Sequence, residues 1–210
     1  MNLVFPDFCL GCYRIGSVVC EDCLCQLRFC DQNFCSEDEV LFDRLYYCYD
    51  FDKEHLIRRL VHQFKYRFCV KVGQVLGDLM VEFWKECASG EYLIVPMPVS
   101  ESSFRERGFN QSYILARSVS SKYGYDLIDC LCHCRDHENQ MKLSREERLK
   151  NLDGAISVRD EVRWFIAGKR ILLVDDIATT GASLNECSKV LKMSGAGKID
   201  CLVLARAGMS

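Results

Sequence analysis

The stretch ILLVDDIATTGAS, residues 171–183, decides the fold. Four apolar residues run into the adjacent carboxylates Asp175 and Asp176, and small hydroxylated residues around Gly181 follow at once. A short apolar run bounded by such a turn is typical of a strand that is buried on both faces of a parallel sheet. The next segment, from Gly181 to Met193, is expected to be a helix. Its inward residues are Leu184, Cys187, Val190 and Leu191.

Apolar runs and amphipathic segments alternate through most of the chain. Strands are expected at 45–51, 92–99, 126–134, 170–176 and 199–205, and helices at 54–66, 70–86, 108–123 and 181–193. Strands that alternate with helices of this length predict an α/β fold, with a mostly parallel sheet and helices on both faces. In such sheets the ligand crevice lies beyond the carboxyl ends of the strands, where Asp175 and Asp176 are expected.

Composition limits the classes of protein that the chain can represent. Its 210 residues are 49% hydrophobic and 27% charged with a formal net charge of −3, which excludes a globally basic nucleic-acid binder and leaves room for local basic faces. The first residues, MNLVFPDFCLGC, lack the basic start of a targeting segment, and no apolar run approaches the ~18 residues of a spanning helix. We therefore expect a cytoplasmic protein without membrane insertion.

Cysteines divide the chain into two parts. Seven of the fifteen lie in residues 9–35, ahead of a polar, acidic stretch. The chain is too large for the class of small secreted disulfide scaffolds, and an odd number of cysteines cannot pair fully within it. Reduced thiols that bind a metal fit better. We expect a zinc-binding module with its linker at 1–44 and a larger α/β domain at 45–210.

The metal ligands are expected in two closely spaced pairs. Cys9 and Cys12 form one CxxC, and Cys20 and Cys23 form a second after seven residues. Four thiolates complete the tetrahedral shell of a structural zinc ion, which would supply folding free energy to so small a segment. The alternative is a redox-active CxxC, which would need a thioredoxin-like βαβ setting that the sequence around these cysteines lacks. Nothing in the spacing assigns a role to Cys25, Cys30 or Cys35.

The turn after the central strand is suited to a phosphate. Amide groups at a helix N-terminus bind phosphate, and Gly181 allows close approach of the backbone. Two carboxylates directly before the turn would repel a bare phosphate, whereas a phosphorylated sugar can donate its hydroxyls to them directly or through Mg²⁺. The alternative is a capped turn beside a solvated Asp pair. The expected phosphate-binding residues are Ala178, Thr179, Thr180, Gly181, Ala182 and Ser183.

This stretch resembles the phosphoribosyl diphosphate (PRPP) binding motif of type I phosphoribosyltransferases. FKY (64–66), IVPMPV (94–99), RERGFNQ (105–111), and Gln140 with LSREERLKNLDGA (143–155) follow the order seen in the ComF family. By this resemblance the chain is identified as a ComF member. That family is associated with competence for DNA uptake and joins a cysteine-rich zinc module to a phosphoribosyltransferase-like domain. The resemblance therefore implies this fold for residues 45–210.

The resemblance also implies roles for further residues. The loop from Pro96 to Ser100 would take the pyrophosphate-loop position, and residues 136–153 would form a mobile hood over the site. The alternative reading of the charged RERG and REER segments is a solvated helix face. Relatives commonly have a histidine and an arginine where this chain has Ser100–Ser103, which weakens the case for turnover more than the case for binding. The expected pyrophosphate and hood residues are Lys65, Met97, Arg105, Arg107, Arg145 and Arg148.

Two hypotheses about function follow. In the first, the chain binds PRPP with Mg²⁺ and transfers phosphoribose to an acceptor, a pentosyl transfer in which Asp175 and Asp176 stabilise developing positive charge. In the second, a non-catalytic pocket protein binds single-stranded DNA beside a DNA-uptake helicase or processing protein. The second rests on a basic segment with aromatic neighbours. Its residues are Lys53, Arg58, Arg59, Lys65, Tyr66, Arg67, Phe68 and Lys71.

Overall fold

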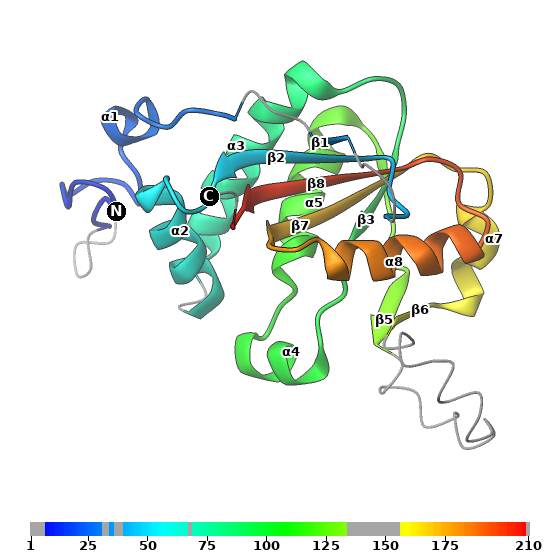
Figure 1. Cartoon of the computed structure of the whole chain (residues 1–210). Coiled ribbons are helices and arrows are strands. Elements are labelled where there is room, and N and C mark those ends of the chain that lie inside the picture. The colour runs from blue at the N-terminus through cyan, green and yellow to red at the C-terminus, as the bar shows by residue number, and fades with distance from the viewer. Residues whose placement is uncertain (1–6, 31–33, 36–39, 67–68, 134–155, 209–210) are drawn as a thin grey trace.

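The computed structural model describes residues 7–30, 34–35, 40–66, 69–133 and 156–208 (Figure 1). The expected hood at 136–153, with Gln140, Arg145 and Arg148, lies outside the described residues. No helix in the described ranges is long and apolar enough to cross a bilayer.

The main sheet has six strands in the order β1-β2-β8-β7-β3-β4. They are β1 (Phe34–Cys35), β2 (Arg44–Asp50), β3 (Leu93–Pro96), β4 (Asp126–Leu127), β7 (Ile171–Ala178) and β8 (Ile199–Arg206). Every neighbouring pair is parallel except β1 with β2, which is antiparallel. The prediction of a mostly parallel α/β sheet is confirmed.

Helices cover both faces of this sheet (Figure 1). On one side lie α2 (His55–Tyr66), α3 (Val70–Cys87) and α5 (Gln111–Tyr123), and on the other lie α8 (Ala182–Met193) and the short α7 (Arg163–Ile166). Smaller elements are α1 (Glu21–Leu24), α4 (Glu101–Arg107) and the 3₁₀ turn η3 (Asp160–Val162). Because β7 is buried on both faces, its alternate residues enter two separate cores: Leu172 and Val174 one, Ile171 and Leu173 the other.

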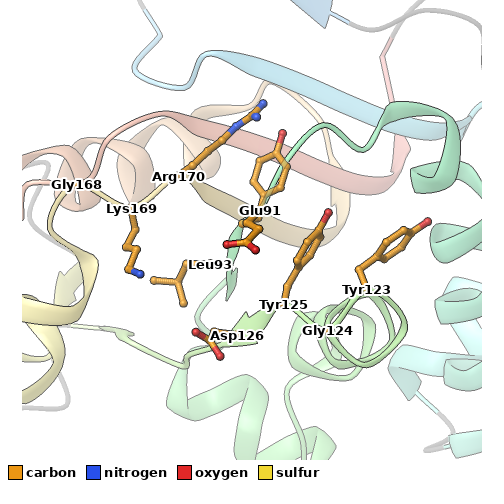
Figure 2. Close-up of a pocket in the computed structure, with 10 residues that line it drawn as sticks. Glu91, Leu93, Tyr123, Gly124, Tyr125, Asp126, Gly168, Lys169 and Arg170 are labelled. Carbon is orange, nitrogen blue, oxygen red and sulfur yellow. The ribbon is translucent and has the colours of Figure 1, made fainter.

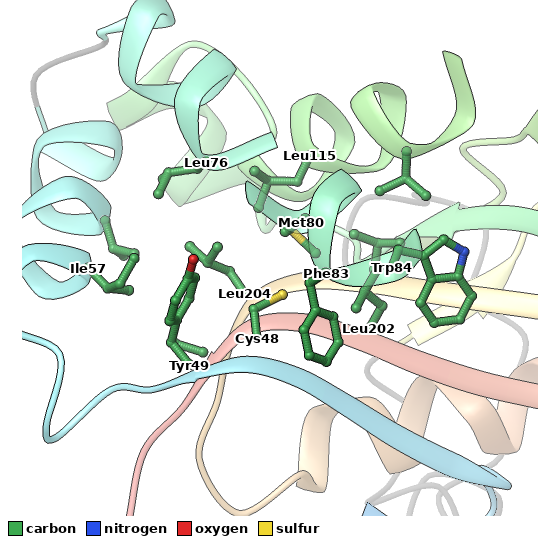
Figure 3. Close-up of a cluster of buried hydrophobic side chains, with 14 of the residues drawn as sticks. Cys48, Tyr49, Ile57, Leu76, Met80, Phe83, Trp84, Leu115, Leu202 and Leu204 are labelled. Carbon is green, nitrogen blue, oxygen red and sulfur yellow. The ribbon is translucent and has the colours of Figure 1, made fainter. Parts of the chain in front are cut away.

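The larger core forms under α2, α3 and α5. Figure 3 shows Ile57, Leu76, Met80 and Leu115 facing Tyr49, Leu202 and Leu204 of the sheet. Cys9, Val19 and Cys23 belong to the same buried cluster, so the cysteine-rich segment packs directly on the main core. The boundary expected after residue 44 stays a prediction.

The prediction of one strand at 126–134 was wrong. β4 ends at Leu127, and β5 (Leu131–His133) instead pairs antiparallel with β6 (Ile156–Val158) in a separate two-stranded sheet. The reason lies in β3. Leu93 and Met97 donate their backbone N–H groups to β7, which leaves Ile94 and Pro96 facing β4. Pro96 has no N–H to donate, so the ladder with β4 cannot continue past this point.

The prediction of one helix from Gly108 to Tyr123 was also wrong at its start. Gly108 has a left-handed backbone, with φ of 76°, and ends α4. Asn110 then caps α5, because its side chain accepts from the N–H of Tyr113. Ser100 caps α4 in the same way by accepting from Ser103, so Ser100–Ser103 form a helix start. The predicted strand at 92–99 is shorter, and the one at 170–176 continues to Ala178.

Candidate functional site

The connections of β3 and β7 create a crevice between them. β3 leads through α4 and α5 to β4 on one side, whereas β7 leads through α8 to β8 on the other. The two strands are neighbours, and the N–H of Met97 donates to the carbonyl of Val174 at 2.9 Å. In an open parallel sheet, ligands bind where the connections of two neighbouring strands lead in opposite directions, beyond the carboxyl ends of those strands. The topology therefore places the candidate site after Pro96 and Ala178.

Asp175 and Asp176 lie near the end of β7 and contact different helices. Asp175 Oδ1 accepts from Ser112 Oγ of α5 at 2.7 Å and from the N–H of Asp176 at 2.8 Å. Asp176 Oδ2 lies 2.9 Å from Lys65 Nζ, near the end of α2. Asp176 is buried and Asp175 is partly buried. Both carboxylates are therefore held by partners before any ligand arrives.

Burial and crowding change the protonation of Asp175. Burial, followed by the negative charge of Asp176, raises the pKa of Asp175 to about 7, although its hydrogen bond from Ser112 opposes the change. Carboxylate oxygens are the ligands that Mg²⁺ prefers in proteins, and a divalent ion would relieve the repulsion within the pair. Asp175 and Asp176 thus suit Mg²⁺ in their donor atoms and in their charge.

The turn between β7 and α8 faces solvent. Thr179, Thr180 and Ser183 are exposed, while Ala178 is buried. Gly181 has a φ of 79°, a left-handed conformation that other residues rarely adopt. The N–H of Ala182 points toward the turn, where Thr180 Oγ1 accepts from it at 3.3 Å. Five of the six residues expected to bind phosphate, 179–183, therefore form an accessible turn that leads into a twelve-residue helix, and the sixth, Ala178, is the buried end of β7.

Three of the expected pyrophosphate-side residues lie around the same crevice. The side-chain amide of Asn110 donates to the carbonyl of Met97 at 3.0 Å, which ties the loop after β3 to the start of α5. Arg107 lies over the ring of Tyr66, 5.9 Å from its centroid, next to Lys65. Arg107 Nη1 also donates to Gln111 Oε1 at 3.2 Å.

Arg105 is placed differently. Its guanidinium lies 2.5 Å from Glu101 on the exposed surface of α4, so a carboxylate of the same helix already neutralises it. Gln111 and Ser112 were not among the predicted site residues, although both are buried: Ser112 contacts Asp175, and Gln111 contacts Arg107. Their position directly after RERGFN was the available signal, because Asn110 caps a helix whose first residues must face the crevice.

The four predicted metal ligands converge. The Sγ atoms of Cys9, Cys12, Cys20 and Cys23 all lie within 4.8 Å of one another. The N–H groups of Gly11 and Cys20 donate to Cys9 Sγ at 3.4 and 3.3 Å, which favours a thiolate there. A Cβ at Gly11 would lie 2.5 Å from Cys23 Sγ, so only glycine fits. This four-cysteine cluster is suited to a metal such as zinc.

A separate pocket of about 330 Å³ opens at the opposite edge of the sheet (Figure 2). Tyr123 and Tyr125 stand on one side of it and Lys169 and Arg170 on the other. It lies at the amino ends of β3, β4 and β7, far along the strands from Asp176. None of the predicted site residues lines it.

Comparison with known proteins identifies relatives along nearly the whole chain. No family model matches. Competence protein F of Haemophilus influenzae is 29% identical over 99% of this chain and 93% of its own length. Competence protein ComFC of Bacillus subtilis is 30% identical over 99% of this chain and 81% of its own length. The chain belongs to the ComF family of competence proteins. A further relative of this chain is the DNA utilization protein YhgH of Salmonella typhimurium, which is 28% identical over 70% of this chain and 66% of its own length.

Comparison with solved structures finds chains that are similar to this ComF protein at low sequence identity. The allosteric regulatory enzyme of purine biosynthesis is 19% identical with a TM-score of 0.45, over 63% of this chain and 26% of that one. A purine phosphoribosyltransferase from Pyrococcus horikoshii is 14% identical with a TM-score of 0.38, over 77% and 87%. This chain thus spans about a quarter of the first structure.

Proposed function

We propose that this ComF protein binds PRPP with Mg²⁺ in the crevice between β3 and β7. The proposal rests on three kinds of group that lie together at the carboxyl ends of the strands. They are the turn at 178–183, the carboxylates Asp175 and Asp176, and the cations Lys65 and Arg107. A phosphorylated sugar with a diphosphate has complementary groups for all three.

Each part of the ligand has a matching part of the crevice. The 5-phosphate would lie in the turn at 178–183, against the N-terminus of α8, which has room because the turn is exposed. Ribose hydroxyls, or Mg²⁺ coordinated to them, would face Asp175 and Asp176. The diphosphate would then extend toward Arg107 and the loop that begins at Met97. Magnesium, when bound, would neutralise charge on the diphosphate and on the Asp pair.

Lys65 would change partners when the ligand binds. Its ammonium compensates the charge of Asp176 in the free protein, at 2.9 Å. A sugar hydroxyl or a metal ion at Asp176 would release Lys65 toward the diphosphate. Asp176 has already lost its water on folding. The free-energy cost of desolvating this carboxylate therefore does not fall on ligand binding.

We further propose that the same crevice supports pentosyl transfer. The bond between ribose C1 and the diphosphate oxygen would break with its electron pair leaving on the diphosphate, while an acceptor atom forms the new bond to C1. Positive charge that develops on the sugar would be stabilised by Asp175 and Asp176. Glu101 already neutralises Arg105, which leaves one cation fewer for the leaving diphosphate, so we expect turnover to be slow compared with binding.

Isothermal titration calorimetry tests binding. PRPP should bind the wild type in the presence of Mg²⁺, and Asp176→Asn should weaken binding by about tenfold or more, because a charged contact is lost. Asp160→Asn, which removes an exposed carboxylate of η3, is the matched control and should bind like the wild type. No heat from PRPP with the wild type would contradict the proposal. Release of diphosphate from bound PRPP, assayed with candidate acceptors, tests transfer separately.

A second candidate function is binding of single-stranded DNA, which one surface of α2 favours. His55, Arg59, His62 and Tyr66 are exposed and spaced so that they follow one face of the helix. The rings of His62 and Tyr66 lie 4.8 Å apart, and Arg59 lies over the ring of Tyr13 at 5.7 Å. A cation among exposed rings suits single strands. The expected contributors Arg67 and Phe68 lie outside the described residues.

Salt-dependent binding of a labelled oligonucleotide tests this second function. The double substitution Arg58→Ala with Arg59→Ala should lower the affinity and reduce the slope of log affinity against log salt by roughly one to two, because each phosphate contact contributes about 0.7 for a single strand. Arg163→Ala, on exposed α7, is a control for charge alone. Unchanged affinity and slope in the double variant would rule out this surface.

We also propose a cellular setting. The relatives are named for competence and for DNA utilization, so this ComF protein would act in DNA uptake, in the cytoplasm, beside a DNA-uptake helicase or processing protein. Zinc at the four-cysteine cluster would hold residues 1–44 as a module on the domain at 45–210. Loss of transformation on deletion of the gene, restored by the wild type, would support this setting; normal transformation would contradict it.

A further inference from the structure

Two buried nitrogen donors lack an acceptor where α4 ends and α5 begins. Arg107 Nε and Gln111 Nε2 are buried and have no hydrogen-bond partner within the described part of the chain. Gln111 is 4% exposed, so water does not reach its amide freely. Leaving such a group unpaired costs about 1–3 kcal/mol, and native proteins usually pair it or use it.

The orientation of the Gln111 amide is fixed by its neighbour. Its oxygen accepts from Arg107 Nη1 at 3.2 Å, and the opposite orientation would set an NH₂ group against the guanidinium. The free atom is therefore the donor nitrogen. Arg107 and Gln111, which are joined by this hydrogen bond, thus each keep one unpaired N–H group, one of them charged, and the group that complements both is an oxygen with negative charge.

Residues adjacent to these donors contact the carboxylate pair. Ser112, the next residue along α5, donates to Asp175, and Arg107 lies over Tyr66, which adjoins Lys65. Lys65 in turn neutralises Asp176. The α5 helix has thirteen residues, so the positive end of its dipole also favours an anion here.

An entry route exists because α4 is held loosely. None of its residues, Glu101–Arg107, is buried as a whole. The cap at Ser100 and the ion pair between Arg105 and Glu101 lie within the helix, and Arg107 at its end contacts Gln111 and Tyr66, so the turns before Arg107 can shift while the donors stay in place. A segment with so little buried apolar surface shifts at low cost, which would open the donors to a ligand.

We propose that Gln111 Nε2 and Arg107 Nε form a paired donor site for an oxygen of the ligand diphosphate, with Gln111 as a binding residue beyond those that the sequence indicated. The inference rests on the proposed function, since the donors then select PRPP over ribose 5-phosphate. The turn at 178–183 supplies affinity for the sugar phosphate, whereas Gln111 and Arg107 supply the extra affinity for the diphosphate.

Titration with three probes tests the inference: PRPP, inorganic diphosphate and ribose 5-phosphate, each with Mg²⁺. Gln111→Glu keeps the acceptor for Arg107 and replaces the donor, so it should weaken PRPP and diphosphate at least about tenfold and leave ribose 5-phosphate within about twofold. Gln74→Glu, on the exposed face of α3, adds the same charge and should bind all three like the wild type. Arg107→Lys keeps the positive charge and removes the Nε donor. It should also weaken PRPP and diphosphate binding while ribose 5-phosphate binding stays nearly unchanged.

The outcomes separate this inference from the proposed function. Wild-type protein that binds neither PRPP nor ribose 5-phosphate would overturn both. Wild-type protein that binds PRPP while Gln111→Glu binds it equally well would overturn the donor pair alone. An equal loss for PRPP and ribose 5-phosphate in a folded Gln111→Glu variant would show a purely structural role and also reject the inference. If Gln111→Glu unfolds, Arg107→Lys decides by the same comparison.

Discussion

Lys65 Nζ lies 2.9 Å from Asp176 Oδ2, and this ion pair joins the end of α2 to the end of β7. The two residues are more than one hundred positions apart in the chain. They come together because α2 follows β2 and packs on the same face of the sheet as α3 and α5. The pair brings a cation and a carboxylate of the proposed crevice into direct contact.

Removing the cation should destabilise the fold. Lys65→Met leaves Asp176 unpaired and only 10% exposed beside Asp175, so we expect the free energy of unfolding to fall by about 1–3 kcal/mol. Urea denaturation at neutral pH measures the change. Lys85→Met removes an exposed pair with Glu82 and should change stability by less than about 0.5 kcal/mol. Equal effects of the two substitutions would contradict the assignment of a buried pair.

The raised pKa of Asp175 predicts how stability depends on pH. An ordinary Asp has a pKa near 3.9, so between about pH 4 and pH 7 the folded state binds a proton that the unfolded state lacks. Stability should therefore fall as pH rises through this range, with a slope of up to about 1.4 kcal/mol per pH unit. Asp175→Asn should remove this contribution, as measured by urea unfolding in magnesium-free buffer. If Asp175→Asn shows the same dependence of unfolding free energy on pH as the wild type, a group other than Asp175 causes that dependence.

Gly181 gives a test that separates stability from binding. An L side chain in its left-handed conformation costs about 1–2 kcal/mol, so Gly181→Ala should lower the melting temperature and distort the turn. Gly124→Ala meets the same strain at φ of +70° in a distant turn. Both variants should lose similar stability, while only Gly181→Ala should lose affinity for ribose 5-phosphate in calorimetry. Parallel losses of affinity would argue against a phosphate site in the turn.

Metal content tests the cysteine cluster. Elemental analysis should find about one zinc ion per chain in the wild type, because four thiolates fill one tetrahedral shell. Cys9→Ser should lose the metal and unfold at lower temperature, since Cys9 is fully buried in the main core. Cys25→Ser alters an exposed cysteine outside the cluster and should keep its zinc. A metal-free wild type with an unchanged melting temperature under chelation would reject the site.

The sequence was most informative where one physical demand dominated. β7 was predictable because a strand covered on both faces needs an unbroken apolar run, and the turn was predictable because glycine and hydroxylated residues follow carboxylates there. The cysteine cluster was predictable because CxxC spacing suits a single ion. The α/β class followed from the alternation of such segments.

Other features depend on partners that lie far along the chain. β4 ends at Leu127, opposite Ile94 and just before the register reaches Pro96 of β3, which the alternation of residues 126–134 does not reveal. Gly108 divides α4 from α5 through a single left-handed residue inside a helical pattern. The contacts of Lys65 with Asp176 and of Ser112 with Asp175 arise only when α2, α5 and β7 meet.

A crystal structure of the wild type with PRPP and Mg²⁺ tests the central claim most directly. The account predicts electron density for the 5-phosphate against the backbone amides of residues 179–183, with the ribose over Asp175 and Asp176 and the diphosphate near Arg107 and Gln111. Density for the sugar phosphate at any other place, or a saturated crystal in which the turn holds no ligand, would contradict it.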